Sequence, residues 1–284
     1  MGDGGAIEPG LHLVAVPIGA ARDITLRALD LLRGADVLAA EDTRSLRRLM
    51  EIHGVALGDR PLIPYHDHNG AEARPRLLAA LREGRSVAYA SEAGTPLIAD
   101  PGFQLGAAAR AEGIAVRAAP GASAVLAALC VGGLPTDRFT FAGFLPPKAA
   151  ARRAALAELE AAPGTLVLYE SPRRLGALLA EAAERYGSRR AAVCRELTKR
   201  FEEVVEGTLP ELAARFAEEV PKGEIVVLID RAAPAPADEA ALEALLAEAM
   251  ETMSLKSAVK DVSARTGVGR NVVYEVALRV RDGS

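Results

Sequence analysis

The chain has 284 residues, half of them hydrophobic, with 34 basic and 38 acidic side chains and a formal net charge of −4. This length can bury the cores of two ordinary domains. The acidic balance excludes a uniformly basic nucleic-acid-binding coat, although it is compatible with a local basic patch. Aromatic residues make up only 4% and Trp is absent, which argues against an aromatic platform for stacking bases.

Cysteine, histidine and the N-terminal residues exclude further classes. Cys130 and Cys194 lie in apolar stretches and offer no disulfide framework. The four histidines lack a zinc spacing, and His66-Asp67-His68 is more typical of a polar loop, so we expect no metal. Residues 1–10 lack the basic and apolar regions of a signal peptide, and no apolar run has the length of a membrane span. We therefore expect a soluble, cytoplasmic protein without a membrane partner.

Short β-rich runs alternate with Ala/Leu-rich helical stretches along most of the chain. The predicted strands are 11–16, 36–40, 86–90, 115–118, 139–144, 165–169, 190–195, 203–207 and 224–229. The predicted helices before the C-terminal tail are 25–33, 43–53, 71–83, 104–112, 123–131, 149–161, 173–186 and 210–219. Strands separated by helices of this length predict βαβ units and a largely parallel sheet. The close spacing of the strands after about residue 190 predicts mixed or antiparallel pairing in the second half.

Two changes in composition predict the domain boundaries. The segment GGLPTD at 132–137 separates a first α/β domain, 11–131, from a second one, 132–231. Residues 1–10 are expected to form a flexible N-terminus. The Ala/Pro-rich segment 232–238 is a short, stiff linker by composition.

The tail, residues 239–284, is predicted to be entirely helical. A helix over 239–253 precedes two shorter ones, 255–266 and 270–280, and a glycine-containing turn joins these two as in a helix-turn-helix. Residues 254–284 contain six basic and three acidic side chains, a net charge of +3 that contrasts with the acidic whole. We predict a small module that binds nucleic acid; a plain helical packing tail is the alternative.

Polar loops rich in glycine and proline follow most of the predicted strands. The most informative is SEAGTPLIADPG at 91–102, because glycine lets the backbone approach a ligand and proline fixes the turn around it. Loops that leave the carboxyl ends of parallel strands meet at one edge of the sheet. The residues expected to share a cleft there are Pro17, Asp42, Thr95, Asp100 and Ser123. The GxGxxG, P-loop and GxSxG fingerprints are absent from the sequence.

In this order, the loops resemble those of the tetrapyrrole-methylase-like class of S-adenosylmethionine-dependent methyltransferases. The resemblance rests on VPIGAARDITLRAL (16–29), EDTR (41–44), SEAGTPLIADPG (91–102), PGASA (120–124), ESPRRL (170–175), RELTKRFEEVVEGTL (195–209) and KGEIVVLI (222–229). EDTR, SEAGTP and ESPRRL together are typical of the branch whose bacterial members 2′-O-methylate a cytidine in the decoding centre of 16S ribosomal RNA. A porphyrin-precursor methylase would carry GDP where residues 94–96 read GTP. The resemblance covers residues 11–231, and the helical tail also suits it.

The resemblance implies two α/β domains with S-adenosylmethionine bound in the cleft between them, a small C-terminal helical module and usually a homodimer. It calls for no metal. The cofactor-binding residues that it implies are Pro17, Ile18, Gly94, Thr95, Ile98, Ser123, Ala124, Tyr169, Leu197 and Gly223.

The implied reaction is an in-line attack of a ribose 2′-oxygen on the sulfonium methyl group, which requires placement of the two atoms and removal of the hydroxyl proton. The candidate bases are Asp42, Glu92, Asp100 and Glu196. Asp100 could instead form a turn before Pro101, Asp42 could pair with Arg44, and positioning without a dedicated base stays open. The candidate RNA-binding residues are Arg44, Arg173, Arg195, Lys199, Lys256, Lys260 and Arg270.

The expected partner is 16S rRNA, within the assembled 30S subunit. Two alternatives stay open. One is a methyltransferase of the same fold that acts on a small cyclic substrate or a protein, which would not need a basic tail. The other is a nucleoside-sensing regulator whose tail binds DNA, which a gel shift with duplex DNA would reveal.

Overall fold

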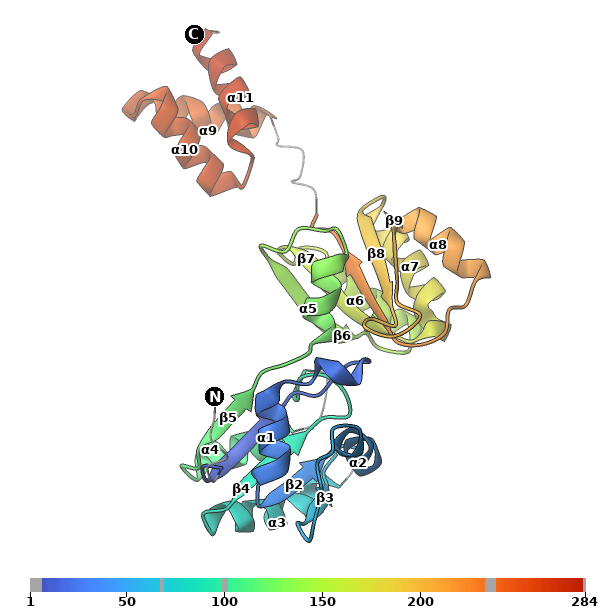
Figure 1. Cartoon of the computed structure of the whole chain (residues 1–284). Helices are drawn as coiled ribbons and strands as arrows, with labels where there is room; N and C mark the ends of the chain where they lie inside the picture. Colours follow the sequence, from blue (N-terminus) through green and yellow to red (C-terminus); the bar gives the residue numbers. More distant parts are fainter. Residues whose placement is uncertain (1–6, 67–68, 99–101, 233–238, 283–284) are drawn as a thin grey trace. The chain divides into compact units, whose positions relative to one another are not determined.

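The computed structural model describes residues 7–66, 69–98, 102–232 and 239–282 of the chain (Figure 1). The chain divides into two compact units, Met1–Arg231 and Ala232–Ser284. The first unit contains two lobes, each built on its own five-stranded sheet; we call them the N-lobe and the C-lobe. Of the predicted features, the candidate base Asp100, residues 1–6 of the N-terminal segment and residues 233–238 of the linker lie outside the described residues.

The strands and helices alternate along the first unit much as predicted. Its strands are β1 (Gly10–Val14), β2 (Val37–Ala40), β3 (Leu62–Pro64), β4 (Ser86–Ala90), β5 (Val116–Ala119), β6 (Phe139–Phe144), β7 (Thr165–Glu170), β8 (Arg190–Arg195), β9 (Glu203–Thr208) and β10 (Ile225–Ile229). Its helices are η1 (Ala21–Asp23), α1 (Leu26–Gly34), α2 (Thr43–Ile52), α3 (Gly70–Arg82), α4 (Phe103–Ala111), α5 (Ala124–Val131), α6 (Ala149–Leu159), α7 (Pro172–Tyr186) and α8 (Leu209–Glu218).

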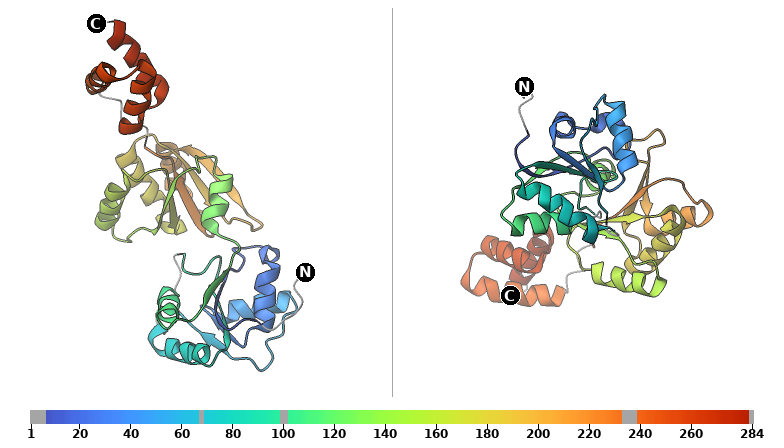
Figure 2. Two further views of the ribbon diagram at one scale, coloured as in Figure 1. Left: turned by 90° about the vertical axis from the view of Figure 1, so that its left-hand side faces the viewer. Right: turned by 90° about the horizontal axis from the view of Figure 1, so that it is seen from below.

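The N-lobe sheet is parallel throughout, with the strand order β3-β2-β4-β1-β5. All five residues of its central strand β4 are buried, because helices cover both faces, as a parallel sheet requires. Helices α1 and α2 pack on one face and α3 and α4 on the other (Figures 1 and 2). The short edge strand β3 was not predicted, since it has only three residues and one of them is Pro64.

The C-lobe sheet is mixed, with the order β6-β7-β10-β8-β9. Its first pair, β6 with β7, is parallel, and the other three pairs are antiparallel. This confirms the mixed pairing expected from the close spacing of the last strands, since antiparallel neighbours can be joined by short connections. Helices α6, α7 and α8 pack on one face of the sheet.

Helix α5 follows the N-lobe sheet in sequence but packs against the C-lobe sheet. Val125, Ala128 and Leu129 are buried against β7, β8 and β10. A Cβ on Gly132 would lie 2.2 Å from Leu228 Cδ1, which shows how closely the end of α5 approaches that sheet. The boundary predicted at residues 131 and 132 therefore falls after a helix that packs with the second lobe. The sequence AVLAALCV is apolar on all sides, so its pattern does not indicate which sheet it covers.

The second unit is a bundle of three helices, α9 (Glu239–Thr252), α10 (Leu255–Thr266) and α11 (Arg270–Asp282), with its own apolar core. Ser254 caps the N-terminus of α10 by accepting a hydrogen bond from the Ser257 amide. Gly267 ends α10 in the left-handed conformation that favours glycine. In the part of the chain that the structure describes, no helix is both long and apolar enough to cross a membrane.

Candidate functional site

A cavity of about 690 Å³ is lined by both lobes of the first unit. This volume lies within the usual range for small-molecule and cofactor sites, about 300–1,000 Å³. It is lined by every residue predicted to bind the cofactor: Pro17, Ile18, Gly94, Thr95, Ile98, Ser123, Ala124, Tyr169, Leu197 and Gly223. The structure thus brings these ten residues together, and their contact with a cofactor stays a prediction.

The N-lobe wall of the cavity consists of the loops that follow β1, β4 and β5. Val16 and Gly94 exchange two backbone hydrogen bonds, of 2.9 and 3.1 Å. Gly94 has a φ of +74°, and a Cβ at this position would lie 3.2 Å from Ile18 Cγ2, so the turn favours glycine. The Thr95 hydroxyl donates a hydrogen bond of 2.9 Å to the Ala122 carbonyl. These bonds hold the three loops together at the carboxyl edge of the sheet.

The C-lobe wall includes a tight turn at residues 196–199. Glu196 and Thr198 both have a positive φ, 51° and 65°, a strained conformation that the surrounding hydrogen bonds must hold. The Ala20 amide of the N-lobe donates a hydrogen bond of 3.0 Å to Thr198 Oγ1 and so ties the two loops together.

The Glu196 carboxylate is fully engaged within this turn. It accepts hydrogen bonds from Lys199 Nζ, 2.8 Å away, and from the Glu224 amide, 3.1 Å away. The bond from Lys199 is the main reason why the pKa of Glu196 lies below its ordinary value. A Cβ on Gly223 would lie 2.3 Å from this carboxyl group, so only glycine lets the segment before β10 come this close.

The rest of the C-lobe wall is apolar and aromatic. Tyr169 lies edge-on to Phe144, with ring centroids 5.5 Å apart, and Leu197, Ile225 and Val226 continue the surface. Sequence reasoning missed Phe144, Ile225 and Val226 as site residues. Phe144 ends the strand beside β7, and its place at a strand end next to Tyr169 was the signal that could have found it.

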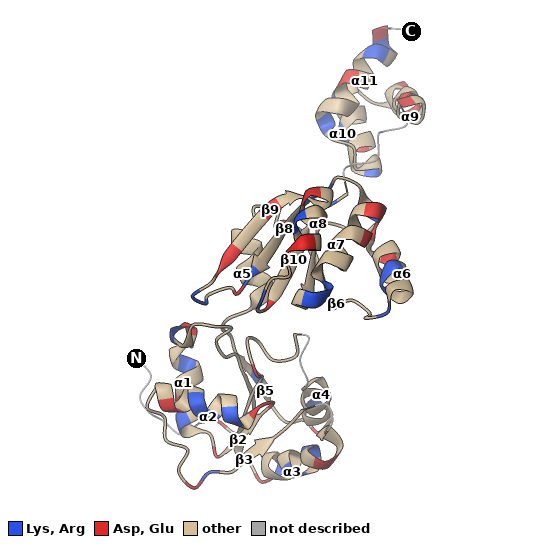
Figure 3. Cartoon of the chain, turned by 90° about the vertical axis from the view of Figure 1, so that its right-hand side faces the viewer, with Lys and Arg blue, Asp and Glu red and all other residues tan. Residues whose placement is uncertain are grey.

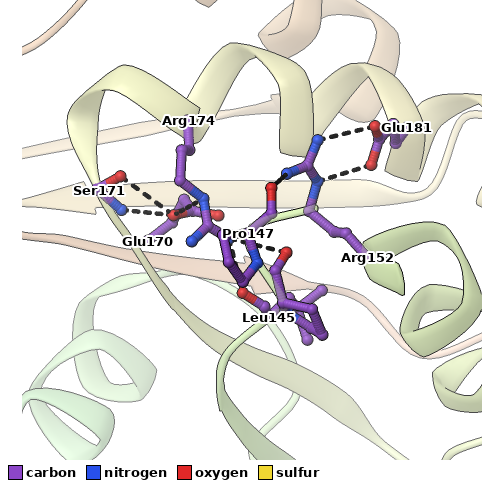
Figure 4. A network of polar contacts seen from close by, with 8 residues as sticks. Leu145, Pro147, Arg152, Glu170, Ser171, Arg174 and Glu181 are labelled. Carbon is purple, nitrogen blue, oxygen red and sulfur yellow. Dashed lines mark hydrogen bonds and ion pairs between the residues drawn. The ribbon is translucent and has the colours of Figure 1, made fainter. Parts of the chain in front are cut away.

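A buried glutamate that was also missed lies at the end of β7 (Figure 4). Glu170 Oε1 accepts a hydrogen bond of 2.7 Å from the Ser171 amide and lies 3.1 Å from Arg174 Nε. Arg174 Nη2 donates in turn to the Leu145 carbonyl, 2.7 Å away, in the loop after β6. Glu170 lines the cavity, and its buried Oε2 has no hydrogen-bond partner among the described residues. The Glu170 side chain is 0% exposed, so this oxygen is enclosed by protein and does not face the cavity.

A buried ion pair fixes the same loop from its other side (Figure 4). Arg152 donates two hydrogen bonds, of 2.7 and 2.8 Å, to the Glu181 carboxylate, and a third, of 3.2 Å, to the Pro147 carbonyl. The side chains of Arg152 and Glu181 are 6% and 13% exposed. The loop after β6, which borders the cavity at Phe144, is thus held by two arginines.

The cavity's chemistry fits S-adenosylmethionine. Its apolar and aromatic C-lobe residues, Phe144, Tyr169 and Leu197, suit the faces of an adenine ring. The N-terminus of α5 lies at the cavity through Ser123 and Ala124, and helix N-terminal amides favour a carboxylate such as that of an amino acid. No group of three or more metal-binding side chains occurs in the described part of the chain.

The candidate bases differ in the hydrogen bonds and ion pairs that their carboxylates make. Asp42 caps α2 by accepting a hydrogen bond of 2.8 Å from the Arg44 amide. It also accepts bonds from the Arg44 side chain, and these are the main cause of its lowered pKa. Asp42 and Glu196 are therefore weak proton acceptors with structural roles. Glu92 lines the cavity, and its carboxylate makes no hydrogen bond or ion pair with the described residues.

The candidate RNA-binding residues lie in different places. Arg44 is 91% exposed beside Asp42, and Arg173 is exposed in the first turn of α7. Arg195 pairs with Glu203 at 2.9 Å. Lys199 lies at the cavity, but its ammonium is held by Glu196 and Glu224. In the second unit, the three candidates, Lys256, Lys260 and Arg270, are all exposed.

Comparison with known proteins agrees with this geometry. The family described as Tetrapyrrole (Corrin/Porphyrin) Methylases matches residues 10–213, and the RsmI C-terminal HTH domain matches residues 236–281. A relative from Mesorhizobium japonicum, ribosomal RNA small subunit methyltransferase I, is 47% identical over 281 residues, which are 98% of this chain and 94% of the relative. The chain belongs to the tetrapyrrole methylases, in the branch of ribosomal RNA small subunit methyltransferase I. This confirms the resemblance and the fold class inferred from the sequence.

Solved structures share the fold of the two lobes. The methyltransferase CobJ has a TM-score of 0.60 and 19% identity, over 79% of this chain and 95% of that one. Uroporphyrin-III C-methyltransferase from Thermus thermophilus, solved in complex with S-adenosylhomocysteine, has a TM-score of 0.52 and 22% identity, over 77% of this chain and 96% of that one. The chain thus has the architecture of a methyltransferase.

Proposed function

We propose that this protein uses S-adenosylmethionine to methylate small-subunit ribosomal RNA, at the 2′-oxygen of a cytidine in the decoding centre of 16S rRNA. One observation carries the proposal. Two of the three motifs that distinguish the rRNA branch in sequence, SEAGTP (91–96) and ESPRRL (170–175), contribute residues to a single cavity shared by both lobes, and the third, EDTR (41–44), contributes residues to a neighbouring cavity. The family membership of the chain supports the same activity.

Different residues of the cavity would bind different parts of S-adenosylmethionine. When bound, S-adenosylmethionine supplies a methyl group made electrophilic by a sulfonium. Tyr169, Leu197 and Phe144 would pack on its adenosine part. The amides at Ser123 and Ala124 would hold its amino-acid part. Such fixed contacts leave the methyl group in one place, which is most of what a bimolecular transfer needs.

Glu92 is the residue that we assign to the acceptor's hydroxyl proton. Its carboxylate lines the cavity and makes no hydrogen bond or ion pair in the described part of the chain, so it is free to accept a hydrogen bond from the attacking oxygen. General base catalysis of this kind contributes roughly 10²–10⁴-fold in rate. Asp42 and Glu196 would have to give up the hydrogen bonds that lower their pKa values.

The proposal extends to the cellular location, the RNA contacts and the oligomeric state. The protein acts in the cytoplasm on the assembled 30S subunit. In the first unit, Arg44 and Arg173 have exposed side chains for RNA contact, whereas Arg195 and Lys199 are paired with carboxylates and would contribute less. The helical tail, 239–284, adds phosphate contacts from Lys256, Lys260 and Arg270. Phosphate contacts position an RNA-binding protein, while the folded RNA supplies the shape that it recognises. We also propose a homodimer, supported by the exposed apolar residues Leu126 and Val131 of α5; sedimentation equilibrium tests it.

The decisive experiment uses the purified protein, radiolabelled S-adenosylmethionine and unmodified 30S subunits, followed by digestion of the RNA to nucleosides. Label in 2′-O-methylcytidine is the expected result. Label in another nucleoside would keep the rRNA activity and overturn the assigned atom. No label, with donor binding established by calorimetry, would overturn the function and favour a small-molecule or protein acceptor. A shift of duplex DNA in the same preparation would favour a regulator.

The tail has its own test. Substituting Lys256, Lys260 and Arg270 together by alanine should weaken binding to 30S subunits and leave donor affinity intact. Unchanged affinity for the subunit would remove the tail from the RNA-binding surface.

A further inference from the structure

A second cavity adjoins the first one on the side of α2. It has a volume of about 560 Å³, and we call it the α2 cavity. The two cavities share four lining residues, Pro17, Gly19, Ser45 and Glu92. They are therefore continuous along the edge of the N-lobe, and a ligand in one would lie directly beside a ligand in the other.

The α2 cavity combines an apolar wall with a basic rim. Leu46, Leu49 and Ile52 of α2 line it, and Ile52 is 52% exposed. Arg44 and Arg48 line it too, with side chains 91% and 73% exposed. An apolar wall suits the face of a nucleobase, and exposed guanidinium groups suit phosphates.

Arg47 and Arg48 are the α2 arginines most available to a ligand, because Arg44 already pairs with Asp42 at 3.2 Å. Arg48 pairs with Glu51 across 3.4 Å, and Glu51 is itself 68% exposed. An exposed pair of this kind contributes little to stability, so a phosphate can replace the carboxylate. The neighbouring Arg47 is exposed and makes no ion pair with the described residues. Figure 3 shows the resulting basic segments of α2.

The opposite rim of the first cavity offers no comparable site for phosphates. Its cation, Lys199, is held by Glu196 at 2.8 Å and Glu224 at 3.1 Å. Glu170 and Glu224 also line that side. The α2 cavity is also lined by two carboxylates, Asp42 and Glu92, but its two arginines balance them, whereas the C-lobe rim has two carboxylates to one lysine. The charges therefore favour a polyanion on the α2 side.

We infer that the α2 cavity is the acceptor subsite, which takes the nucleotide to be methylated with its base against Leu49 and Ile52. The flanking phosphates lie on Arg44, Arg47 and Arg48. Glu92 lines both cavities and so lies where the acceptor's hydroxyl meets the donor. The inference rests on the proposed function, since it assumes an RNA acceptor.

The first test removes two charges from α2 and compares the result with the removal of two charges elsewhere. In R47A/R48A, binding to unmodified 30S subunits without donor should weaken about tenfold. The slope of log affinity against log salt should fall by about 0.7–0.9 for each phosphate that the variant no longer neutralises. The control is R76A/R110A, which removes two exposed arginines of α3 and α4 that make no ion pair with the described residues. It should retain affinity and slope. If R47A/R48A and R76A/R110A bound 30S subunits with the same affinity and the same salt slope, the inference would be overturned.

The second test changes the sign of a charge at one exposed position of the cavity wall. I52E should weaken 30S binding and raise KM for the subunit, and I52K should strengthen binding. Both should bind S-adenosylmethionine like the wild type in calorimetry, which also shows that the first cavity is folded. The same effect from both variants, or a loss of donor affinity in both, would assign Ile52 to packing and overturn the subsite.

The two levels of the proposal fail in different ways. A wild-type protein that binds donor but labels no RNA overturns the proposed function, whatever the variants do. A wild-type protein that labels RNA, with α2 variants that bind 30S subunits as tightly as R76A/R110A does, overturns the subsite alone.

Discussion

The carboxylates on the two sides of the first cavity differ in whether they have hydrogen-bond or ion-pair partners. On the C-lobe side, Glu196, which does not itself line the cavity, is bonded to Lys199 and to the Glu224 amide. Glu170 is bonded to Ser171 and lies against Arg174. On the N-lobe wall, Glu92 lines the cavity without a hydrogen-bond or ion-pair partner for its carboxylate among the described residues. The carboxylates on the C-lobe side are fixed by these bonds, whereas Glu92 on the N-lobe side has no such partner among the described residues.

The difference follows from what each wall must do. A carboxylate that leaves water needs compensating bonds, and these bonds make it a rigid part of the wall and a poor proton acceptor. A carboxylate at the junction of two cavities keeps its lone pairs for a ligand. Under the proposed function, the C-lobe side would position the bound donor and Glu92 on the N-lobe side would accept the proton.

The largest expected effect is the loss of kcat on substitution of Glu92. E92Q keeps the size of the side chain and removes its basicity, so kcat with 30S subunits should fall by roughly 10²–10⁴-fold, with donor affinity nearly unchanged. E196Q should lower kcat by less than tenfold, since Glu196 is already engaged. Single-turnover kinetics and calorimetry measure both quantities. A larger loss in E196Q than in E92Q would reverse the comparison of the two walls.

The buried ion pair behind the C-lobe wall should give the largest loss of stability. R152M leaves Glu181, 13% exposed, without its main partner, and the free energy of unfolding should fall by about 3–5 kcal/mol. The control is R153A, because Arg153 also approaches Glu181, at 3.7 Å, but is 61% exposed. It should cost less than about 1 kcal/mol. Denaturant unfolding measures both, and equal losses would remove the special role of the buried pair.

Substitution of Gly94, in the N-lobe wall of the cavity, should weaken donor binding, whereas substitution of Gly113 should not. Gly94 and Gly113 both have a φ of +74°, but nothing lies within 4 Å of a Cβ on Gly113, whereas one on Gly94 would lie 3.2 Å from Ile18. G94A and G113A should share a backbone cost of about 1–2 kcal/mol. Only G94A should also weaken donor binding, by about tenfold, in calorimetry. Equal donor affinity in the two variants would place Gly94 away from the ligand.

The smallest effect is the dependence of stability on pH at Glu196. Its folded-state pKa is lowered, mainly by the hydrogen bond from Lys199. The stabilisation is therefore complete above its unfolded pKa of about 4.3 and is lost as the pH falls through the lower folded value. At pH 7, E196Q should reduce the free energy of unfolding by about 1–2 kcal/mol. The gap from wild type should close between about pH 4.3 and the folded pKa; a gap that widens on acidification would contradict the assignment.

Sequence reasoning succeeded where the signal is local. Strands β4, β6 and β8 and helix α10 have the predicted bounds, because apolar runs and periodic helices flanked by turn residues specify them. The short edge strand β3 was missed because three residues carry too little pattern. The loop motifs indicated the residues that line the cavity, since parallel strands send their following loops to one edge.

What the sequence determined by itself is the order of elements, the family and the set of loops that meet at the cavity, because these depend on patterns along the chain. Only the tertiary structure decided that α5 packs on the C-lobe sheet, that Glu170 is buried with a free oxygen, and that Glu92 is free while Asp42 and Glu196 are engaged. The packing of α5 and the bond from the Glu224 amide to Glu196 depend on groups distant in sequence, whereas the pairing of Asp42 with Arg44 is local and was among the alternatives that the sequence left open. Proximity between groups distant in sequence helps to set whether a carboxylate is a structural anchor or a reactive group, and a linear pattern does not contain it.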